Sequence, residues 1–167
     1  MDDPEFRLAQ FNVSRLLAPL DAPEMREFVA FLAPVNAFAE QSPGFLWRLK
    51  DADGGPSSYM PSPYPDPMMI TNLTVWTDLE SLQLFVYDTA HRYFLQNRKR
   101  WFDRVTTRQV VLWWLRSAEW PTLEDAMERL DELERCGSSP TAFSFQSAFD
   151  PDGNPLAFKS TVDGKAL

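Results

Sequence analysis

The sequence predicts an α+β domain whose elements follow the order β-α-β-β-α-β. Four segments with alternating or continuous apolar residues are expected as strands, at residues 8–17, 45–50, 68–76 and 109–116. Two segments with apolar residues at helical spacing lie between them, at residues 21–41 and 79–104. This order predicts a four-stranded antiparallel sheet with two helices on one face, which is the ferredoxin-like arrangement.

The first strand, residues 8–17, alternates between polar and apolar side chains. Gln10, Asn12 and Ser14 fall on one face, whereas Phe11 and Val13 fall on the other. This strand therefore offers a row of polar side chains that a ligand can contact.

The first helix, residues 21–41, begins at a capping aspartate with a proline in the first turn and stops at Ser42-Pro43-Gly44. Asn36 falls near its apolar stripe, so we expect a buried polar group that needs a partner. In the next strand Trp47 and Arg48 lie on opposite faces. Residues 51–67 are rich in proline and glycine and are expected as a surface loop, either a cover for a pocket mouth or a plain connection.

The long helix at residues 79–104 does not keep one apolar face. Its stripe rotates at Tyr87-Asp88-Thr89, so we expect a break there and a new helical segment near Ala90. His91, the single histidine, then lies in a first turn on the face of Phe94, where the helix dipole favours the neutral imidazole. The alternative is a hydrogen-bonded core or interface histidine.

The C-terminal third adds further elements. Residues 122–136 are expected as an appended helix with a charged outer surface, and residues 143–149 as an edge strand or an arm onto a partner. We therefore expect an N-terminal arm at 1–7, a single domain at 8–150 and a flexible tail at 151–167.

The amino-acid composition and net charge limit the classes of function that the protein can have. The net charge of −8 gives no electrostatic support for nucleic-acid binding, and no apolar run reaches bilayer length. One cysteine excludes an intrachain disulfide, and the first residues lack the charge of an export signal, so a cytoplasmic protein is expected. Six tryptophans suit an apolar pocket or a subunit interface. The sheet face without helices would be uncovered in a monomer, so we expect a homodimer.

Motifs with a defined chemistry are missing. The sequence has no glycine-rich phosphate loop, paired-cysteine metal site or nucleophile elbow, and a single histidine argues against an all-protein zinc site. The residues alone therefore do not name a reaction.

Several segments resemble an uncharacterised bacterial family known as a domain of unknown function. They are LAQFNVSRLL, SPGFLWRL, VWTDLESLQLFVYDTAHRYF and VVLWWL, and the resemblance covers residues 8–149. That family is similar in layout to the dimeric α/β barrels, which include antibiotic-biosynthesis monooxygenases, polyketide cyclases and haem-degrading monooxygenases. The resemblance implies a pocket between the sheet and its helices.

The haem-degrading proteins place an asparagine on the first strand and an axial histidine on the second helix, and Asn12 and His91 stand at comparable places. The tryptophan of their second helix has no clear counterpart, since Phe85 or Val86 stands near it. Cofactor-independent oxygenases of this fold use asparagine and tryptophan around an aromatic substrate, parts that Asn12 with Trp76 or Trp113 would play here.

The leading functional hypothesis is a small-molecule enzyme of monooxygenase, cyclase or isomerase type that acts without a cofactor on a hydrophobic, aromatic or polyketide-like substrate. His91 is expected as acid or base and Asn12 as a second catalytic residue. The expected substrate contacts are Gln10, Asn36, Trp47, Arg48, Asn72, Trp76, Tyr87, Phe94 and Trp113. The alternatives are a non-catalytic dimer that binds a hydrophobic ligand, and a haem enzyme with His91 as axial ligand.

Overall fold

The computed structural model describes residues 5–87, 89–104 and 107–157. Its strands are β1 (Phe6–Arg15), β2 (Phe45–Arg48), β3 (Met69–Trp76) and β4 (Val110–Arg116). The α-helices are α1 (Arg26–Gln41), α2 (Leu79–Tyr87), α3 (Thr89–Asn97) and α4 (Leu123–Cys136). Short 3-10 helices span Pro23–Met25, Ser57–Tyr59 and Arg98–Arg100. None of the helices in this described part of the chain combines the length and apolarity needed to cross a bilayer.

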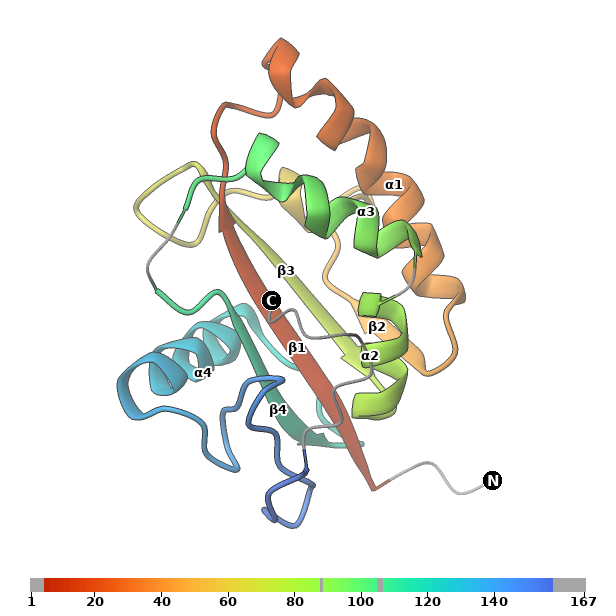
Figure 1. The fold of residues 1–167 in the computed structure, drawn as a ribbon, viewed down its shortest axis with the longest axis vertical. Coiled ribbons are helices and arrows are strands. Elements are labelled where there is room, and N and C mark those ends of the chain that lie inside the picture. Colours follow the sequence, from red (N-terminus) through yellow and green to blue (C-terminus); the bar gives the residue numbers. More distant parts are fainter. Residues whose placement is uncertain (1–4, 88, 105–106, 158–167) are drawn as a thin grey trace.

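The strands form one antiparallel sheet in the order β2-β3-β1-β4 (Figure 1). This order confirms the ferredoxin-like prediction, because the first and third strands are the central pair. The register places Asn12 opposite Asn72 and Gln10 opposite Thr74. Since side chains alternate along a strand, all of these point to the same face of the sheet.

Helices α1, α2 and α3 lie on that face, which we call the helix face (Figure 1). It carries two apolar clusters. The upper cluster has Leu16, Ala18, Met25, Phe28 and Trp101 as its buried members. The lower cluster has Leu8, Ala39, Trp76, Leu82, Leu112, Phe143 and Ala148.

The expected break is at Tyr87-Asp88-Thr89, and Asp88 lies outside the described residues. On either side of it α2 ends at Tyr87 and α3 begins at Thr89, and the two helices run in different directions (Figure 1). The rotated apolar stripe has a physical reason, because α2 packs Leu82 into the lower cluster whereas α3 packs Phe94 into the upper one. The side chain of His91 lies outside the described residues, although its backbone belongs to α3.

Helix α2 begins at a cap formed by Asp78. Burial of this carboxylate opposes ionisation, but the hydrogen bonds it accepts from Ser81 and Thr77 outweigh burial and lower the pKa of Asp78. The backbone N–H of Ser81 donates to Asp78 Oδ1 at 2.8 Å. An ionised side chain at this position satisfies an amide that the helix itself leaves without a partner.

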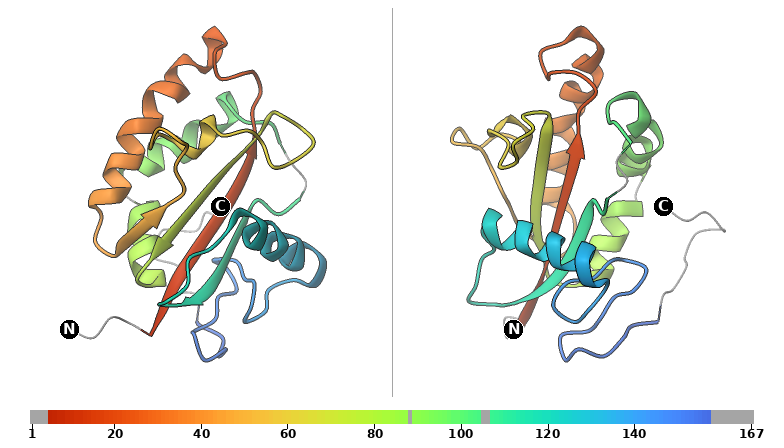
Figure 2. Two further views of the ribbon diagram at one scale, coloured as in Figure 1. Left: turned by 180° about the vertical axis from the view of Figure 1, so that it is seen from behind. Right: turned by 90° about the vertical axis from the view of Figure 1, so that its left-hand side faces the viewer.

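The opposite face of the sheet is covered by α4, so we call it the α4 face (Figure 2). Leu130 and Leu133 of α4 pack in one cluster with Phe11, Val75 and Trp113. The last three are at most 1% exposed. The expectation that this face would be uncovered in a monomer is therefore wrong, because the appended helix buries it within one chain. The argument for a sheet-to-sheet homodimer loses its basis.

The chain after α4 forms the C-terminal arm, residues 138–156, which runs beside β4 (Figure 1). The strand expected at 143–149 is reduced to isolated bridges. In the one that joins β4, Phe143 and Leu112 exchange two backbone hydrogen bonds of 2.9 and 2.8 Å. Trp114 Nε1 donates to the carbonyl of Phe149 at 2.8 Å. The arm thus docks on its own sheet, and its final residues close a turn in which Leu156 N–H donates to Ala148 O.

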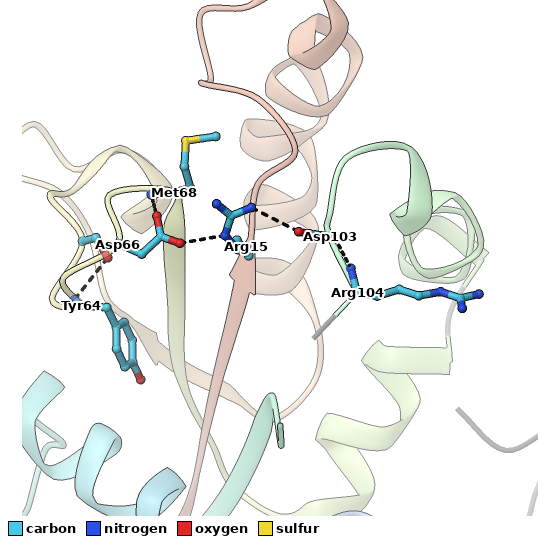
Figure 3. Close-up of polar contacts among 7 residues, drawn as sticks. Arg15, Tyr64, Asp66, Met68, Asp103 and Arg104 are labelled. Atoms are coloured by element: carbon cyan, nitrogen blue, oxygen red, sulfur yellow. Dashed lines mark hydrogen bonds and ion pairs between the residues drawn. The ribbon is translucent and has the colours of Figure 1, made fainter. Parts of the chain in front are cut away.

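Arg15 joins three segments at the C-terminal end of β1 (Figure 3). Its Nε lies 2.7 Å from Asp66 and its Nη1 lies 3.2 Å from Asp103. The Met68 backbone N–H donates to Asp66, and this bond together with Arg15 lowers the pKa of Asp66. The loop at 51–67 is thereby tied to β1, and its Tyr64 packs against the α4 face, away from the helix face.

Replacing Leu133 by alanine should destabilise the protein by about 2 to 5 kcal/mol, because it leaves a cavity in the cluster under α4. Leu133 is 0% exposed, whereas Leu84 on α2 is 66% exposed. Leu84→Ala is thus a matched control that should change the free energy of unfolding by no more than about 0.5 kcal/mol. Urea denaturation measures both, and equal effects would contradict the packing of α4 on the sheet.

Stability should fall in acid partly through Asp66. Its pKa is lowered in the folded state, so its contribution is present above the ordinary value of 3.8 and is lost as pH falls below it. Asp66→Asn should therefore reduce the loss of stability between about pH 7 and about pH 3, as followed by urea denaturation. Asp53→Asn, in the same loop, should keep the wild-type dependence. An unchanged acid response in Asp66→Asn would contradict the contact with Arg15.

Candidate functional site

A polar layer separates the two apolar clusters on the helix face. It consists of Gln10 and Asn12 on β1 with Asn72 and Thr74 on β3. Gln10, Asn12 and Asn72 are partly exposed although they lie on the two central strands, whereas Thr74 is 5% exposed. Solvent therefore reaches the centre of this face at the three carboxamides.

A continuous chain of hydrogen bonds runs through the layer. Trp76 Nε1 donates to Thr74 Oγ1 at 2.9 Å, and Thr74 Oγ1 donates to Gln10 Oε1 at 2.8 Å. Gln10 Nε2 then donates to Asn12 Oδ1 at 2.9 Å. Asn72 Nδ2 donates to the same oxygen at 3.2 Å. The chain starts at a tryptophan that is 0% exposed and ends at the partly exposed carboxamides.

The direction of the bonds in this chain agrees with the chemistry of the indole. An indole N–H only donates, so Thr74 accepts from Trp76, and its single hydroxyl proton goes to Gln10. Gln10 presents its oxygen to Thr74 and its amide nitrogen to Asn12. The hydrogen-bond network thus distinguishes two carboxamide ends that are alike in shape.

These hydrogen bonds orient the carboxamide of Asn12. Its oxygen accepts two hydrogen bonds, from Gln10 and Asn72, so its amide nitrogen is turned away from both. No described residue accepts a hydrogen bond from Asn12 Nδ2. This partly exposed amide therefore carries two oriented donors for an acceptor oxygen, the arrangement that stabilises a developing oxyanion.

Helix α1 also carries a polar side chain between the two apolar clusters. Its sheet-facing stripe passes from Phe28 in the upper cluster to Ala39 in the lower cluster, and Asn36 lies on this stripe between them. Asn36 is partly exposed and has no hydrogen-bond partner among the described residues.

The α2–α3 break lies where the covering helices pass from the lower to the upper cluster. Tyr87, the last residue of α2, is partly exposed, and Phe94 of α3 packs in the upper cluster. The two clusters thus bound the polar layer with aromatic side chains. This arrangement suits a ligand with an apolar body and a central oxygen.

The other expected site residues lie elsewhere. Trp113 belongs to the buried cluster on the α4 face, and Trp47 packs against the same cluster, so neither can line one pocket with Asn12. Arg48 is 8% exposed and points to Glu40 of α1, with Nε to Oε1 at 2.8 Å, and to the carbonyl of Gly55. Arg48 ties β2 to α1 and to the following loop instead of joining the carboxamides.

Thr74 is the member of the polar layer that sequence analysis missed. A threonine on a strand is commonly placed there by its β-branched shape, which gives no sign of a hydrogen-bonding role. The signal that could have found it is its spacing of two residues from both Asn72 and Trp76, which puts all three on one face.

The polar layer contains no titratable side chain, so any proton transfer needs a base from outside it. Among the described residues, no group of histidine, cysteine, aspartate and glutamate side chains could hold a metal ion. The histidine expected as a haem ligand or base, His91, has its side chain outside these residues.

Comparison with known proteins identifies a family but no activity. The profile of a family described as a domain of unknown function (DUF3291) matches residues 7–159. No curated protein matches the sequence.

Solved structures with a similar chain path share little sequence. A conserved protein from Methanosarcina mazei is 11% identical, with a TM-score of 0.45 and coverage of 68% of this chain and 95% of that one. SnoaB, a cofactor-independent oxygenase from Streptomyces nogalater, is 17% identical, with a TM-score of 0.41 and coverage of 70% and 96%. A protein provisionally assigned as an antibiotic biosynthesis monooxygenase from Nitrosomonas europaea is 9% identical, with a TM-score of 0.44 and coverage of 73% and 98%. The fold assignment depends on the strand order of this chain itself.

Thr74→Val tests the chain of hydrogen bonds. The substitution keeps the shape but leaves Trp76 Nε1 buried without an acceptor, so it should destabilise the protein by about 1 to 3 kcal/mol. Thr71 on the same strand is equally buried, at 5% exposed, and its hydroxyl has no hydrogen-bond partner among the described residues. Thr71→Val is therefore the matched control and should be neutral or slightly stabilising in urea denaturation. Equal losses in the two variants would contradict the chain.

Proposed function

The chain belongs to the family described as a domain of unknown function (DUF3291), and we propose that this member is a small-molecule enzyme whose substrate is hydrophobic, aromatic or polyketide-like. The observation that carries the proposal is the oriented amide of Asn12 at the accessible end of a buried hydrogen-bond chain. Its proposed role is to donate to an oxygen of the substrate.

The physical reason is preorganisation. Free carboxamides rotate and must be ordered when charge develops on a substrate, whereas Asn12 is held by Gln10 and Asn72 before any ligand arrives. Donors fixed in advance toward an enolate or phenolate oxygen lower the barrier to forming it. Enolate formation is a step that oxygenation, cyclisation and isomerisation of aromatic ketones share, which leaves the final reaction among these three.

The polar layer needs an external base, and we propose His91 for that part. Its backbone lies in the first turn of α3, directly after the helix break. A position near a helix N-terminus favours the neutral imidazole, which can accept a proton. In this proposal His91 removes a proton from the carbon beside the carbonyl, and Asn12 Nδ2 donates to the oxygen on which negative charge develops.

The remaining residues of the proposed site lie on the helix face of the sheet or on the helices that cover it. Gln10 and Asn72 orient Asn12, Asn36 offers a further amide from α1, and Tyr87 and Phe94 lie on the covering helices. Trp76 would act on a substrate indirectly, through its hydrogen bond to Thr74.

The proposal predicts catalysed exchange of the acidic methylene protons of anthrone, a tricyclic aromatic ketone, with D2O. Asn12→Asp keeps the shape but replaces the donor by an acceptor, so it should slow the exchange about 100- to 1000-fold. His91→Ala should slow it about 100-fold or more. Proton NMR of anthrone measures the rate.

Ser14→Ala is the control, because Ser14 lies on the same face of β1 and its hydroxyl makes no hydrogen bond with a described residue. It should retain wild-type exchange. Tight binding of anthrone with no catalysed exchange would contradict catalysis and support the alternative of a non-catalytic hydrophobic-ligand carrier. Wild-type exchange in Asn12→Asp would contradict the role of the oriented amide.

A further inference from the structure

A cavity lies between the C-terminal arm and the start of β4. Its volume is about 650 Å³. This volume is within the range of pockets that hold small organic molecules. Its lining residues are Arg108, Ser138, Ser144, Gln146, Ser147, Ala148, Phe149, Pro155 and Leu156. None of them belongs to the polar layer, so this cavity is separate from the proposed active site.

The cavity lining includes polar side chains and one cation, Arg108. The guanidinium of Arg108 forms no ion pair with a described residue, in a chain whose net charge is −8. The backbone N–H of Arg108 donates to Glu134 Oε2 at 2.8 Å, which holds the start of β4 against the end of α4. This contact fixes the backbone of Arg108 and leaves its side chain for a ligand.

The serine residues in the cavity lining belong to the C-terminal arm. Ser144 is 7% exposed, and its backbone N–H donates to Ser138 Oγ at 3.2 Å. Ser138 Oγ donates to Ser144 Oγ at 3.4 Å, so Ser144 accepts there and its own hydroxyl proton has no acceptor among the described residues. A nine-tenths-buried hydroxyl with an unused donor in a cavity wall is a feature that a ligand oxygen would satisfy.

The lining also has apolar members. They are Ala148, Phe149, Pro155 and Leu156, which is 39% exposed. An exposed leucine and an arginine without an ion pair in one cavity lining offer both contacts that an amphipathic molecule needs.

We propose that this cavity binds a small amphipathic acid, with its carboxylate on Arg108 and Ser144 and its apolar chain on Phe149 and Leu156. A carboxylate fits better than a phosphate dianion, because one guanidinium fork matches one carboxylate and the carboxylate of Glu134 stands nearby. Nothing in this inference depends on the reaction proposed for the polar layer.

Titration of the full-length protein with decanoate, followed by ¹H–¹⁵N NMR, tests the inference. Decanoate should shift the amide resonances of Arg108 and of the arm. Arg108→Gln should weaken binding about tenfold or more, because it removes a charge-assisted bidentate contact. Arg26→Gln is the matched control, since Arg26 is also exposed and forms no ion pair with a described residue. Ser144→Ala should also weaken binding, with a melting temperature close to that of the wild type.

Three comparisons distinguish carboxylate binding in this cavity from nonspecific association. Decanol, acetate and inorganic phosphate should each bind more weakly than decanoate, because each lacks the charge, the apolar chain or the matching shape. Asn12→Asp should bind decanoate as the wild type does. Equal binding by Arg108→Gln and Arg26→Gln, equal binding of decanol or phosphate, or shifts confined to the polar layer would each overturn the inference.

Discussion

The hydrogen bond from Trp76 Nε1 to Thr74 Oγ1 determines how the centre of the helix face is arranged. Both residues are buried, and an indole N–H only donates, so the hydroxyl of Thr74 accepts from Trp76 and gives its proton to Gln10. The orientation of Gln10 then sets that of Asn12. A fully buried tryptophan is thus part of the network that decides which atom of an accessible carboxamide faces a ligand.

The fold places this chain of hydrogen bonds between the two apolar clusters of the helix face. Between these clusters both the sheet and the helices that cover it depart from regular apolar packing. The strands carry Gln10, Asn12, Asn72 and Thr74 there, α1 carries Asn36, and the helix covering β1 breaks between α2 and α3. Clusters packed above and below hold the strands in register, so the polar layer keeps its geometry without a ligand. Stability and the proposed chemistry therefore depend on the same packing.

Much of the fold and part of the candidate site could be predicted from the sequence. Alternation put Gln10 and Asn12 on one face, and the rotating apolar stripe indicated that the two halves of residues 79–104 bury different faces, because both signals are local. The positions of Trp47 and Trp113 depend on strand register and on which face each strand presents, and α4 could cover the second face only through contacts distant in sequence. The direction of the amide of Asn12 was beyond sequence analysis, since it follows from a bond between Trp76 and an unremarked threonine.

Neutron crystallography of the deuterated protein tests the central claim most directly, because it distinguishes amide nitrogen from oxygen by the hydrogen isotopes they carry. We expect deuterium between Gln10 Nε2 and Asn12 Oδ1, and two deuterium atoms on Asn12 Nδ2 directed away from Gln10 and Asn72. Deuterium atoms of Asn12 lying toward Gln10 would contradict the claim, because the amide would then have no donors free for a substrate oxygen.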